Sequence, residues 1–367
     1  MKKLLISAYS LDIGGIETAL ITLLKYLHND YEITLVLEKK QGMFLKDVPN
    51  NVKITTYEIS QKKIAIIRKI DNFIRQRKFI KANGNKFDCS ICYATYSKPC
   101  SFVARKSSKN SILWVHNNYM SFFDGNVEMY KQFFKELKIE EYKKIVFVSE
   151  LDKNIFNAYF PEYNKKTVFC NNLIDYKTII NKSNENITDF KKEDVPTFIN
   201  IGRHDEKQKK ISRIINSTRK LNLQGYKFNV IIIGKGSSTK QYEEMCKDLK
   251  NIKFLGAKKN PYPYLKQSDC FLMSSKFEGY PVVLIESMIL GTPIITTDVS
   301  DAKKDIDKKY GIVVENSEKG VYNGMKKFLD NYNEFKNGYI DKKTKIEKFN
   351  PEKFNEEIKN KVKDIIG

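Results

Sequence analysis

Two glutamates in the C-terminal half of the sequence flank the start of a predicted helix. Glu278 belongs to the segment Glu278-Gly279-Tyr280-Pro281, which follows a short apolar strand, and Glu286 lies eight positions after Glu278. The helix should begin at Pro281, and the free N–H groups of its first turn, approached past Gly279, can bind a diphosphate. Within that helix the Glu286 carboxylate can accept hydrogen bonds from a ribose diol. Glu278, in the loop, can hold the hydroxyls of a sugar.

A loop in the same half carries clustered cations. It follows the strand predicted over 197–201 and contains Arg203, Lys209 and Lys210 ahead of the helix predicted over 211–221. Two cations held by such a loop can neutralise a diphosphate as it leaves, without a metal ion. Taken alone, either lysine is better explained as surface charge.

Two further features lie in the N-terminal half. Gly14 and Gly15 join the first predicted strand to the first helix, where glycines permit close backbone approach to a phosphate or a sugar. His116 ends the strand predicted over 111–116, where an open parallel sheet presents side chains to a ligand. A glycine pair also serves ordinary tight turns, and a histidine can be purely structural, so these alternatives stay open.

Taken together, these segments resemble the retaining GT-B glycosyltransferases of family 4, which includes bacterial capsule and lipopolysaccharide glycosyltransferases. The E-x7-E signature of that family matches Glu278 and Glu286, and its G-G-x-E element matches Gly14, Gly15 and Glu17. The resemblance implies an enzyme that moves a hexose or related sugar from a nucleotide sugar, such as a UDP- or GDP-sugar. The acceptor would be a hydroxyl of a lipid-linked saccharide or cell-surface polysaccharide precursor. Configuration would be retained, without a metal ion or a separate cofactor.

The resemblance also implies a role for each matching residue. Arg203 and Lys209 correspond to the cations on the diphosphate. Glycine often follows this lysine in the family, but Lys210 does so here, which keeps Lys210 as a rival. The implied site residues are His116 and Glu278 for catalysis; Arg203, Lys209, Gly14 and Gly15 for the diphosphate; Glu278, Gly279, Tyr280, Pro281 and Glu286 for the sugar and ribose; and Asn260, Pro261 and Tyr262 for the nucleobase loop.

The elements that must position these residues alternate between strand and helix in two separate series. Strands are expected over 4–9, 32–37, 87–93, 111–116 and 144–148 in the first series, and over 197–201, 228–233, 252–255, 270–273 and 293–296 in the second. Helices are expected between them, for example over 16–27 and 242–249. Such alternation predicts crossover connections and parallel sheets, whose carboxyl-end edges collect ligands.

A chain of 367 residues exceeds what one hydrophobic core usually covers. The expected fold class is therefore α/β, with two Rossmann-like domains whose parallel sheets face each other across a cleft, the GT-B fold. We expect an N-terminal acceptor-side domain over 1–175, a polar linker over 176–195 and a C-terminal nucleotide-sugar domain over 196–350. A helix over 351–366 could return to the first domain.

Positive charge is concentrated in one segment. The chain carries 65 Lys and Arg against 44 Asp and Glu, a net charge of +21, and Lys62–Lys86 contributes nine basic residues and one acid, or +8. Ile66, Ile70 and Phe73 lie at helical spacing among them, which suits a basic amphipathic helix on an anionic membrane surface. A helix that packs its apolar stripe on the core is the alternative. Nucleic acid is not expected as a partner, because no aromatic stacking motif accompanies the lysines.

Several other classes of protein are disfavoured. No apolar run is long enough to cross a membrane, so we expect a cytoplasmic protein that touches the inner face of the cell membrane only through the basic segment. The six cysteines form no metal-ligand pattern, and no metal site is expected. A nicotinamide oxidoreductase would need a complete glycine fingerprint, which Gly234-Lys235-Gly236 does not supply. The alternative to an enzyme is a non-catalytic GT-B subunit that binds a partner transferase or an anionic polymer.

Overall fold

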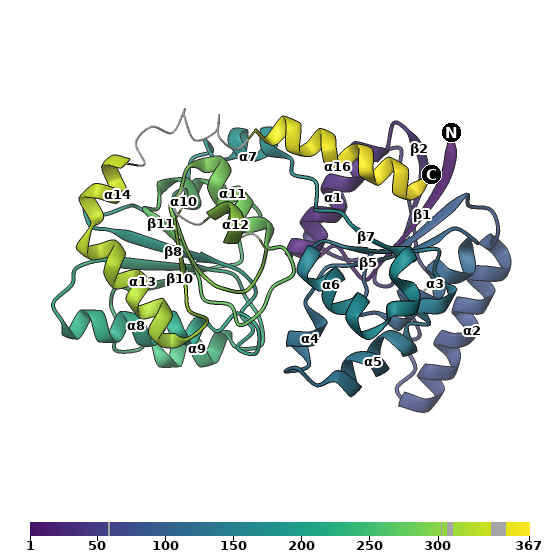
Figure 1. The fold of residues 1–367 in the computed structure, drawn as a ribbon, viewed down its shortest axis with the longest axis horizontal. Coiled ribbons are helices and arrows are strands. Elements are labelled where there is room, and N and C mark those ends of the chain that lie inside the picture. The colour runs from purple at the N-terminus through teal and green to yellow at the C-terminus, as the bar shows by residue number, and fades with distance from the viewer. Residues whose placement is uncertain (58, 302, 307–310, 339–349) are drawn as a thin grey trace. The chain divides into compact units, whose positions relative to one another are not determined.

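Parallel strands alternate with helices along both halves of the chain, as the apolar pattern predicts. The computed structural model describes residues 1–57, 59–301, 303–306, 311–338 and 350–367. They form two units with separate cores, drawn in Figure 1. Met1–Leu173 and Asn355–Gly367 make up the N-terminal unit, and Ile174–Phe354 makes up the C-terminal unit.

The N-terminal unit is built on one sheet in the order β3-β2-β1-β4-β5-β6-β7, with every neighbouring pair parallel. Its central strands are buried along most of their length, which explains their continuous apolar sequences. The strands are β1 (Lys2–Ala8), β2 (Tyr31–Leu37), β3 (Lys53–Thr55), β4 (Cys89–Cys92), β5 (Ser111–Val115), β6 (Lys144–Phe147) and β7 (Thr167–Phe169). The helices are α1 (Gly15–Leu27), α2 (Ala65–Asn83), α3 (Lys98–Ser107), α4 (Tyr119–Phe122), α5 (Val127–Glu136), α6 (Glu150–Tyr159) and the C-terminal α16 (Pro351–Ile366).

The C-terminal unit repeats this plan in the order β10-β9-β8-β11-β12-β13, again with parallel neighbours. Counted from the first strand of each unit, both sheets begin with the order 3-2-1-4-5-6 of a Rossmann fold. The strands are β8 (Thr197–Ile201), β9 (Asn229–Ile233), β10 (Ile252–Gly256), β11 (Cys270–Met273), β12 (Ile294–Thr297) and β13 (Gly311–Val314). The helices are α7 (Tyr176–Lys182), α8 (Ile211–Leu223), α9 (Thr239–Met245), α10 (Tyr262–Gln267), α11 (Val282–Leu290), α12 (Lys303–Ile306), α13 (Glu318–Asp330) and α14 (Tyr332–Gly338). The expected fold class of two Rossmann-like α/β domains is confirmed.

The ends of the two units differ in detail from what the pattern suggests. Residues 176–195 begin with a regular helix, α7, because the Asp175 side chain caps its first turn by accepting a hydrogen bond from the Thr178 N–H at 3.1 Å. At the other end of the chain, α16 packs on the N-terminal unit. Asn355 donates to the Tyr26 hydroxyl at 3.0 Å, and Lys363 pairs with Asp30 at 2.8 Å.

One predicted helix is displaced along the sequence. The helix expected over 242–249 is α9, which starts at Thr239 and ends at Met245. Beyond it the chain turns, with the Leu249 N–H donating to the Cys246 carbonyl at 2.8 Å. Leu249 is buried from this turn rather than from a helix, which is why the apolar spacing alone extended the helix too far.

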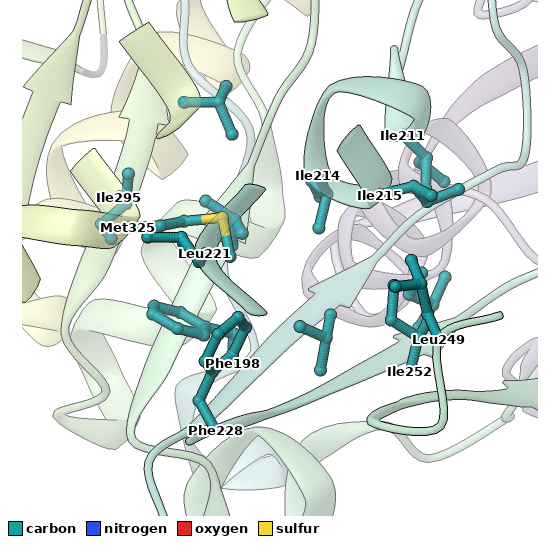
Figure 2. Close-up of a cluster of buried hydrophobic side chains, with 14 of the residues drawn as sticks. Phe198, Ile211, Ile214, Ile215, Leu221, Phe228, Leu249, Ile252, Ile295 and Met325 are labelled. Carbon is teal, nitrogen blue, oxygen red and sulfur yellow. The ribbon is translucent and has the colours of Figure 1, made fainter. Parts of the chain in front are cut away.

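The core of the C-terminal unit lies beneath the strands that carry the candidate site. Figure 2 shows Phe198 of β8 beside Phe228 within this cluster, together with Ile211, Ile214 and Ile215 of α8. The Phe198 ring is fully buried, 5.7 Å from the ring centroid of Phe228 and 5.3 Å from that of Phe328 on α13. Within the described part of the chain, no helix is long and apolar enough to cross a membrane.

Replacing Phe198 by alanine should destabilise the C-terminal unit by about 3–5 kcal/mol, because it leaves a cavity among buried aromatic rings. The single tryptophan, Trp114, is buried in β5 of the N-terminal unit and therefore reports on that unit alone. In chemical denaturation, Phe198→Ala should shift part of the circular-dichroism transition to lower denaturant and leave the Trp114 fluorescence transition in place.

The matched control is Leu223→Ala at the end of α8, where the side chain is 85% exposed. This variant should leave both transitions where they are in the wild type. Equal shifts of the fluorescence and circular-dichroism transitions in Phe198→Ala would mean that the two units unfold together.

Candidate functional site

The candidate site of the C-terminal unit lies where the strand order reverses. Strands β8 and β11 are neighbours, and the chain runs outward from them in opposite directions. Open α/β sheets bind ligands outside the carboxyl ends of their strands at such a reversal. The loop after β8 contains residues 202–210, and the loop after β11 contains residues 274–281.

The two loops are joined by backbone and side-chain hydrogen bonds. The Lys276 N–H donates to the Gln208 carbonyl at 2.7 Å, and the Ser274 hydroxyl donates to the Lys209 carbonyl at 2.9 Å. On the first loop, the Asp205 side chain accepts from the Gln208 N–H at 3.2 Å. These contacts hold the positions of the charged side chains that both loops carry.

Glu278 is the centre of this cluster. Its side chain is almost completely buried, and the carboxylate accepts hydrogen bonds from the Lys209 ammonium at 2.7 Å and the Ser275 hydroxyl at 2.7 Å. The Gln208 amide also donates to it, at 3.3 Å, and accepts from the exposed Arg203 guanidinium at 3.0 Å. A buried carboxylate requires such partners, because an unpaired charge is costly away from water.

The structure therefore brings Arg203, Lys209 and Glu278 into one network. It also adds two residues that the sequence analysis did not select, Gln208 and Ser275. Gln208 lies in the basic loop ahead of α8, and Ser275 lies three residues before Glu278. A neutral amide and a hydroxyl carry no sequence signal of their own. Only the fold shows that they complete the coordination of Glu278.

Lys210 faces away from this network. Its backbone has φ +49°, in the left-handed region that favours glycine, and its ammonium lies 3.5 Å from the Glu206 carboxylate. Glu206 accepts in turn from the hydroxyls of Ser212 at 2.6 Å and Tyr242 at 2.9 Å. Of the two adjacent lysines, only Lys209 contacts Glu278 among the described residues.

Glu286 occupies a different electrostatic environment. It is buried on α11, and the Tyr262 hydroxyl donates to its carboxylate at 3.0 Å. Burial raises the pKa of Glu286 to about 7, partly opposed by the hydrogen bond from Tyr262. This carboxylate has no cation beside it in the described structure, so it retains capacity to accept further hydrogen bonds.

The segments around Glu286 have the local structure expected of them. Pro281 precedes the first residue of α11, and no side chain caps that helix start. Gly279, Tyr280 and Pro281 are buried. In the other predicted segment, the Asn260 amide donates to the Lys182 carbonyl at 2.9 Å and to Glu185 at 2.8 Å. Pro261 precedes Tyr262, the first residue of α10. The Asn260 hydrogen bonds hold this loop against the end of α7.

The short Gly234-Lys235-Gly236 segment after β9 supports the first loop through its backbone. Gly234 has φ +147°, and a Cβ there would lie 1.8 Å from the Gly202 carbonyl oxygen. The His204 N–H donates to the Lys235 carbonyl at 3.1 Å. His204 itself is buried, with Nδ1 2.9 Å from the Thr239 hydroxyl oxygen. These glycines are needed for close packing of two loops.

In the N-terminal unit, the corresponding switch point lies between β1 and β4. Gly14 precedes the first residue of α1, and a Cβ on Gly14 would lie 2.2 Å from a carboxylate oxygen of Glu17. Glycine is therefore required for Glu17 to turn back over the helix start. Gly15 has open space around its Cβ position.

His116 follows β5 and packs against Tyr93 in a tilted arrangement, with ring centroids 4.2 Å apart. Its Nε2 is buried and has no hydrogen-bond partner within the residues that the structure describes. Burial lowers the pKa of His116 to about 3, so the ring is neutral near pH 7. A neutral imidazole with an unused nitrogen can still exchange a hydrogen bond with a ligand.

Comparisons with known proteins point to one chemistry. Residues 182–346 match the family described as glycosyl transferases group 1. The chain is 32% identical over 217 residues to an uncharacterised glycosyltransferase of Methanocaldococcus jannaschii, an alignment that covers 55% of this chain and 52% of that protein. It thus spans about half the length of that relative.

Two more matches extend over nearly the whole chain. The chain is 24% identical over 352 residues to N-acetylgalactosamine-N,N'-diacetylbacillosaminyl-diphospho-undecaprenol 4-alpha-N-acetylgalactosaminyltransferase of Campylobacter jejuni, covering 90% of this chain and 91% of that one. Its fold is similar to that of HepE of Anabaena, solved in complex with UDP-glucose. That comparison has a TM-score of 0.75 at 13% identity and covers 99% of this chain and 100% of that one. Residues 182–346 are thus similar to glycosyl transferases group 1, and the chain has the two-domain α/β fold of GT-B structures such as HepE.

Proposed function

We propose that this chain is a retaining glycosyltransferase that moves a sugar from a nucleoside-diphosphate sugar to a hydroxyl of a lipid-linked saccharide or cell-surface polysaccharide precursor. The observation that carries the proposal is the Glu278 network at the β8–β11 switch point, inside the region that matches glycosyl transferases group 1. The UDP-glucose complex of HepE supports the donor class. The diphospho-undecaprenol acceptor in the name of the C. jejuni relative supports the acceptor class.

In this proposal the C-terminal unit binds the donor. Lys209 and Arg203 neutralise the diphosphate, and Glu278 orients Lys209 while holding sugar hydroxyls. The uncapped N–H groups at the start of α11 approach the phosphates, and Glu286 accepts from the ribose diol. Segment 260–262 contacts the nucleobase. No metal ion takes part, because the two cations supply the required positive charge.

The proposed reaction exchanges two bonds at the anomeric carbon. The bond from that carbon to the diphosphate oxygen breaks, and a bond to the acceptor oxygen forms on the same face of the sugar. The acceptor hydroxyl gives its proton to the leaving diphosphate. Arg203 and Lys209 stabilise the negative charge that accumulates on the diphosphate in the transition state. The N-terminal unit provides the acceptor side, to which Gly14, Gly15 and the His116 nitrogen contribute.

The donor assignment can be tested with a panel of UDP-, GDP- and other nucleotide sugars. At least one should raise the midpoint of thermal unfolding, since a ligand that binds only the folded chain stabilises it. With a polyprenyl-diphosphate saccharide added, the same donor should release its nucleotide, and NMR of the product should show the anomeric configuration of the donor. If no nucleotide sugar binds, the result would favour a non-catalytic subunit over an enzyme. An inverted product would reject retention alone.

Lys209 and Lys210 provide a matched pair of variants. Lys209→Ala should lower kcat/KM by about 100- to 1000-fold, because it removes one cation from the charge that develops on the diphosphate. Lys210→Gly should change kcat/KM by less than about threefold, since this side chain contacts Glu206 and its backbone is left-handed. Steady-state kinetics decide between them, with circular dichroism as the folding control. If Lys210→Gly lowered kcat/KM more than Lys209→Ala, the diphosphate would be assigned to Lys210.

Donor affinity should depend on pH through Glu286. With a pKa of about 7, this carboxyl is mostly protonated at about pH 6 and mostly ionised at about pH 8, and only the ionised form accepts from both ribose hydroxyls. Affinity for an intact nucleotide sugar should therefore rise roughly tenfold over this interval, measured by calorimetry. Glu286→Gln should bind more weakly at high pH and show no such dependence. The same dependence in both proteins would refute the assignment to Glu286.

Protein stability should follow the opposite trend in the absence of donor. The raised pKa means that the folded chain holds a proton on Glu286 between its ordinary pKa and about 7, where the unfolded chain has released it. The contribution of this group to the free energy of unfolding is thus fully present below its unfolded pKa and decreases as pH rises to about 7. Comparing wild type with Glu286→Gln in denaturation isolates that contribution.

A further inference from the structure

Helix α2 turns its apolar stripe away from the body of the N-terminal unit. The core-packing alternative considered for this helix therefore does not hold for these residues. Their side chains are between 45% and 73% exposed, and they are Ile66, Ile67, Ile70, Phe73 and Ile74. Their spacing places them along one face of the helix, next to one another. A continuous row of exposed isoleucine and phenylalanine is unusual on a protein surface and indicates a binding face.

The C-terminal part of α2 holds the helix in place. Phe79 and Ile80 near its C-terminal end pack against the cluster of Leu5, Val36, Tyr57 and Val103, and the Phe79 ring lies 6.5 Å from that of Tyr57. Gln76 is the buried residue of the helix. The apolar stripe is therefore not required for attachment of α2 and is available to a partner.

The charges around the stripe select the kind of partner. Lys62–Lys86 carries nine basic residues and a single acid, Asp71. Asp71 is already paired with Arg75 at 3.1 Å, and hydrogen bonding from Ser60 and Arg75 lowers its pKa. Arg77 lies over the Phe73 ring at 4.4 Å, at the edge of the stripe. An apolar row bordered by cations complements the acyl chains and negative headgroups of an anionic bilayer.

A basic pocket adjoins the same helix. It has a volume of about 840 Å³ and lies at the carboxyl ends of β2 and β3. Its cations are Lys39, Lys40, Lys62 and Arg75. Its two acids are engaged, Asp71 by Arg75 and Glu38 by the Ser97 hydroxyl at 2.5 Å. Lys40 and Lys62 contact no carboxylate among the described residues, and ammonium groups in such a pocket can bind a phosphate group.

We propose that α2 and this pocket form a docking site for an anionic lipid bilayer. The stripe enters the boundary between headgroups and acyl chains, the flanking cations lie on the headgroups, and the pocket holds the phosphate of one lipid. The site consists of residues of the N-terminal unit only, so it depends neither on donor binding nor on the proposed reaction.

The experiment uses the full chain and two vesicle compositions, phosphatidylcholine alone and phosphatidylcholine with about one third phosphatidylglycerol. In sedimentation, the chain should bind the anionic vesicles, bind the neutral ones at least tenfold more weakly, and lose affinity as salt is raised. Ile66→Ser/Ile70→Ser should reduce binding to anionic vesicles by about tenfold or more. The matched control Met129→Ser/Leu223→Ser removes two exposed apolar side chains elsewhere and should bind like wild type.

A fluorescent label tests whether the stripe itself enters the bilayer. All six cysteines are buried, so a cysteine placed on the surface can be labelled selectively. An environment-sensitive dye on Ile70→Cys should shift its emission to shorter wavelength when anionic vesicles are added. The same dye on Leu223→Cys should not shift.

The role of the pocket is tested by comparing two pairs of lysine substitutions. Lys40→Gln/Lys62→Gln should weaken binding to anionic vesicles more than Lys69→Gln/Lys81→Gln, which removes two lysines of α2 that do not line the pocket. Equal losses would reject the phosphate pocket. Equal binding to anionic and neutral vesicles, or no binding to either, would reject the docking site. Self-association of the wild-type chain in sedimentation equilibrium would also reject the docking site if Ile66→Ser/Ile70→Ser makes the protein monomeric. The stripe would then bind a second copy of the chain.

Discussion

The ion pair between Lys209 and Glu278 determines how the C-terminal unit is organised at its functional edge. Glu278 lies almost out of contact with water, so its charge must be balanced within the protein. Lys209 comes from the loop after β8, and Glu278 and Ser275 come from the loop after β11. The requirement to pair one carboxylate thus connects the two loops that diverge at the reversal of strand order. The arrangement of charged side chains at this edge follows from that connection.

The second glutamate shows how the same side chain acquires different properties a few residues away. Glu278 has an ammonium and a hydroxyl within hydrogen-bonding distance, whereas Glu286 has a phenol alone among the described residues. Burial without a cation raises the pKa of Glu286 to about 7. The site therefore contains a carboxylate whose charge is compensated internally and one whose hydrogen-bonding capacity is left for a ligand. A ligand with negative charge at one end and hydroxyl groups at the other matches these two environments.

Positive charge in this chain occurs in two different arrangements. At the β8–β11 edge, Arg203 and Lys209 are few, fixed by hydrogen bonds and close to a buried carboxylate. Along α2, the cations are numerous, mostly exposed and arranged beside an apolar stripe. Fixed cations suit one small anion in a defined position, and a dispersed basic helix suits an extended anionic surface. The total of +21 alone does not distinguish these uses.

The sequence by itself determined the α/β class, the two series of parallel strands and the segments that carry Arg203, Lys209, Glu278 and Glu286. Buried strands such as 197–201 and 270–273 can be predicted from the sequence, because both of their faces are covered and their residues are continuously apolar. The edge strands β3, β7 and β13 are short and only partly buried, so they leave no such run and were not predicted. Tertiary structure alone decided that Gln208 and Ser275 complete the Glu278 network, that Lys210 turns to Glu206, and that the stripe of α2 faces outward. Each of these features depends on contacts between segments far apart in the chain or on a backbone angle. The local spacing of residue types predicts neither the contacts nor the angle.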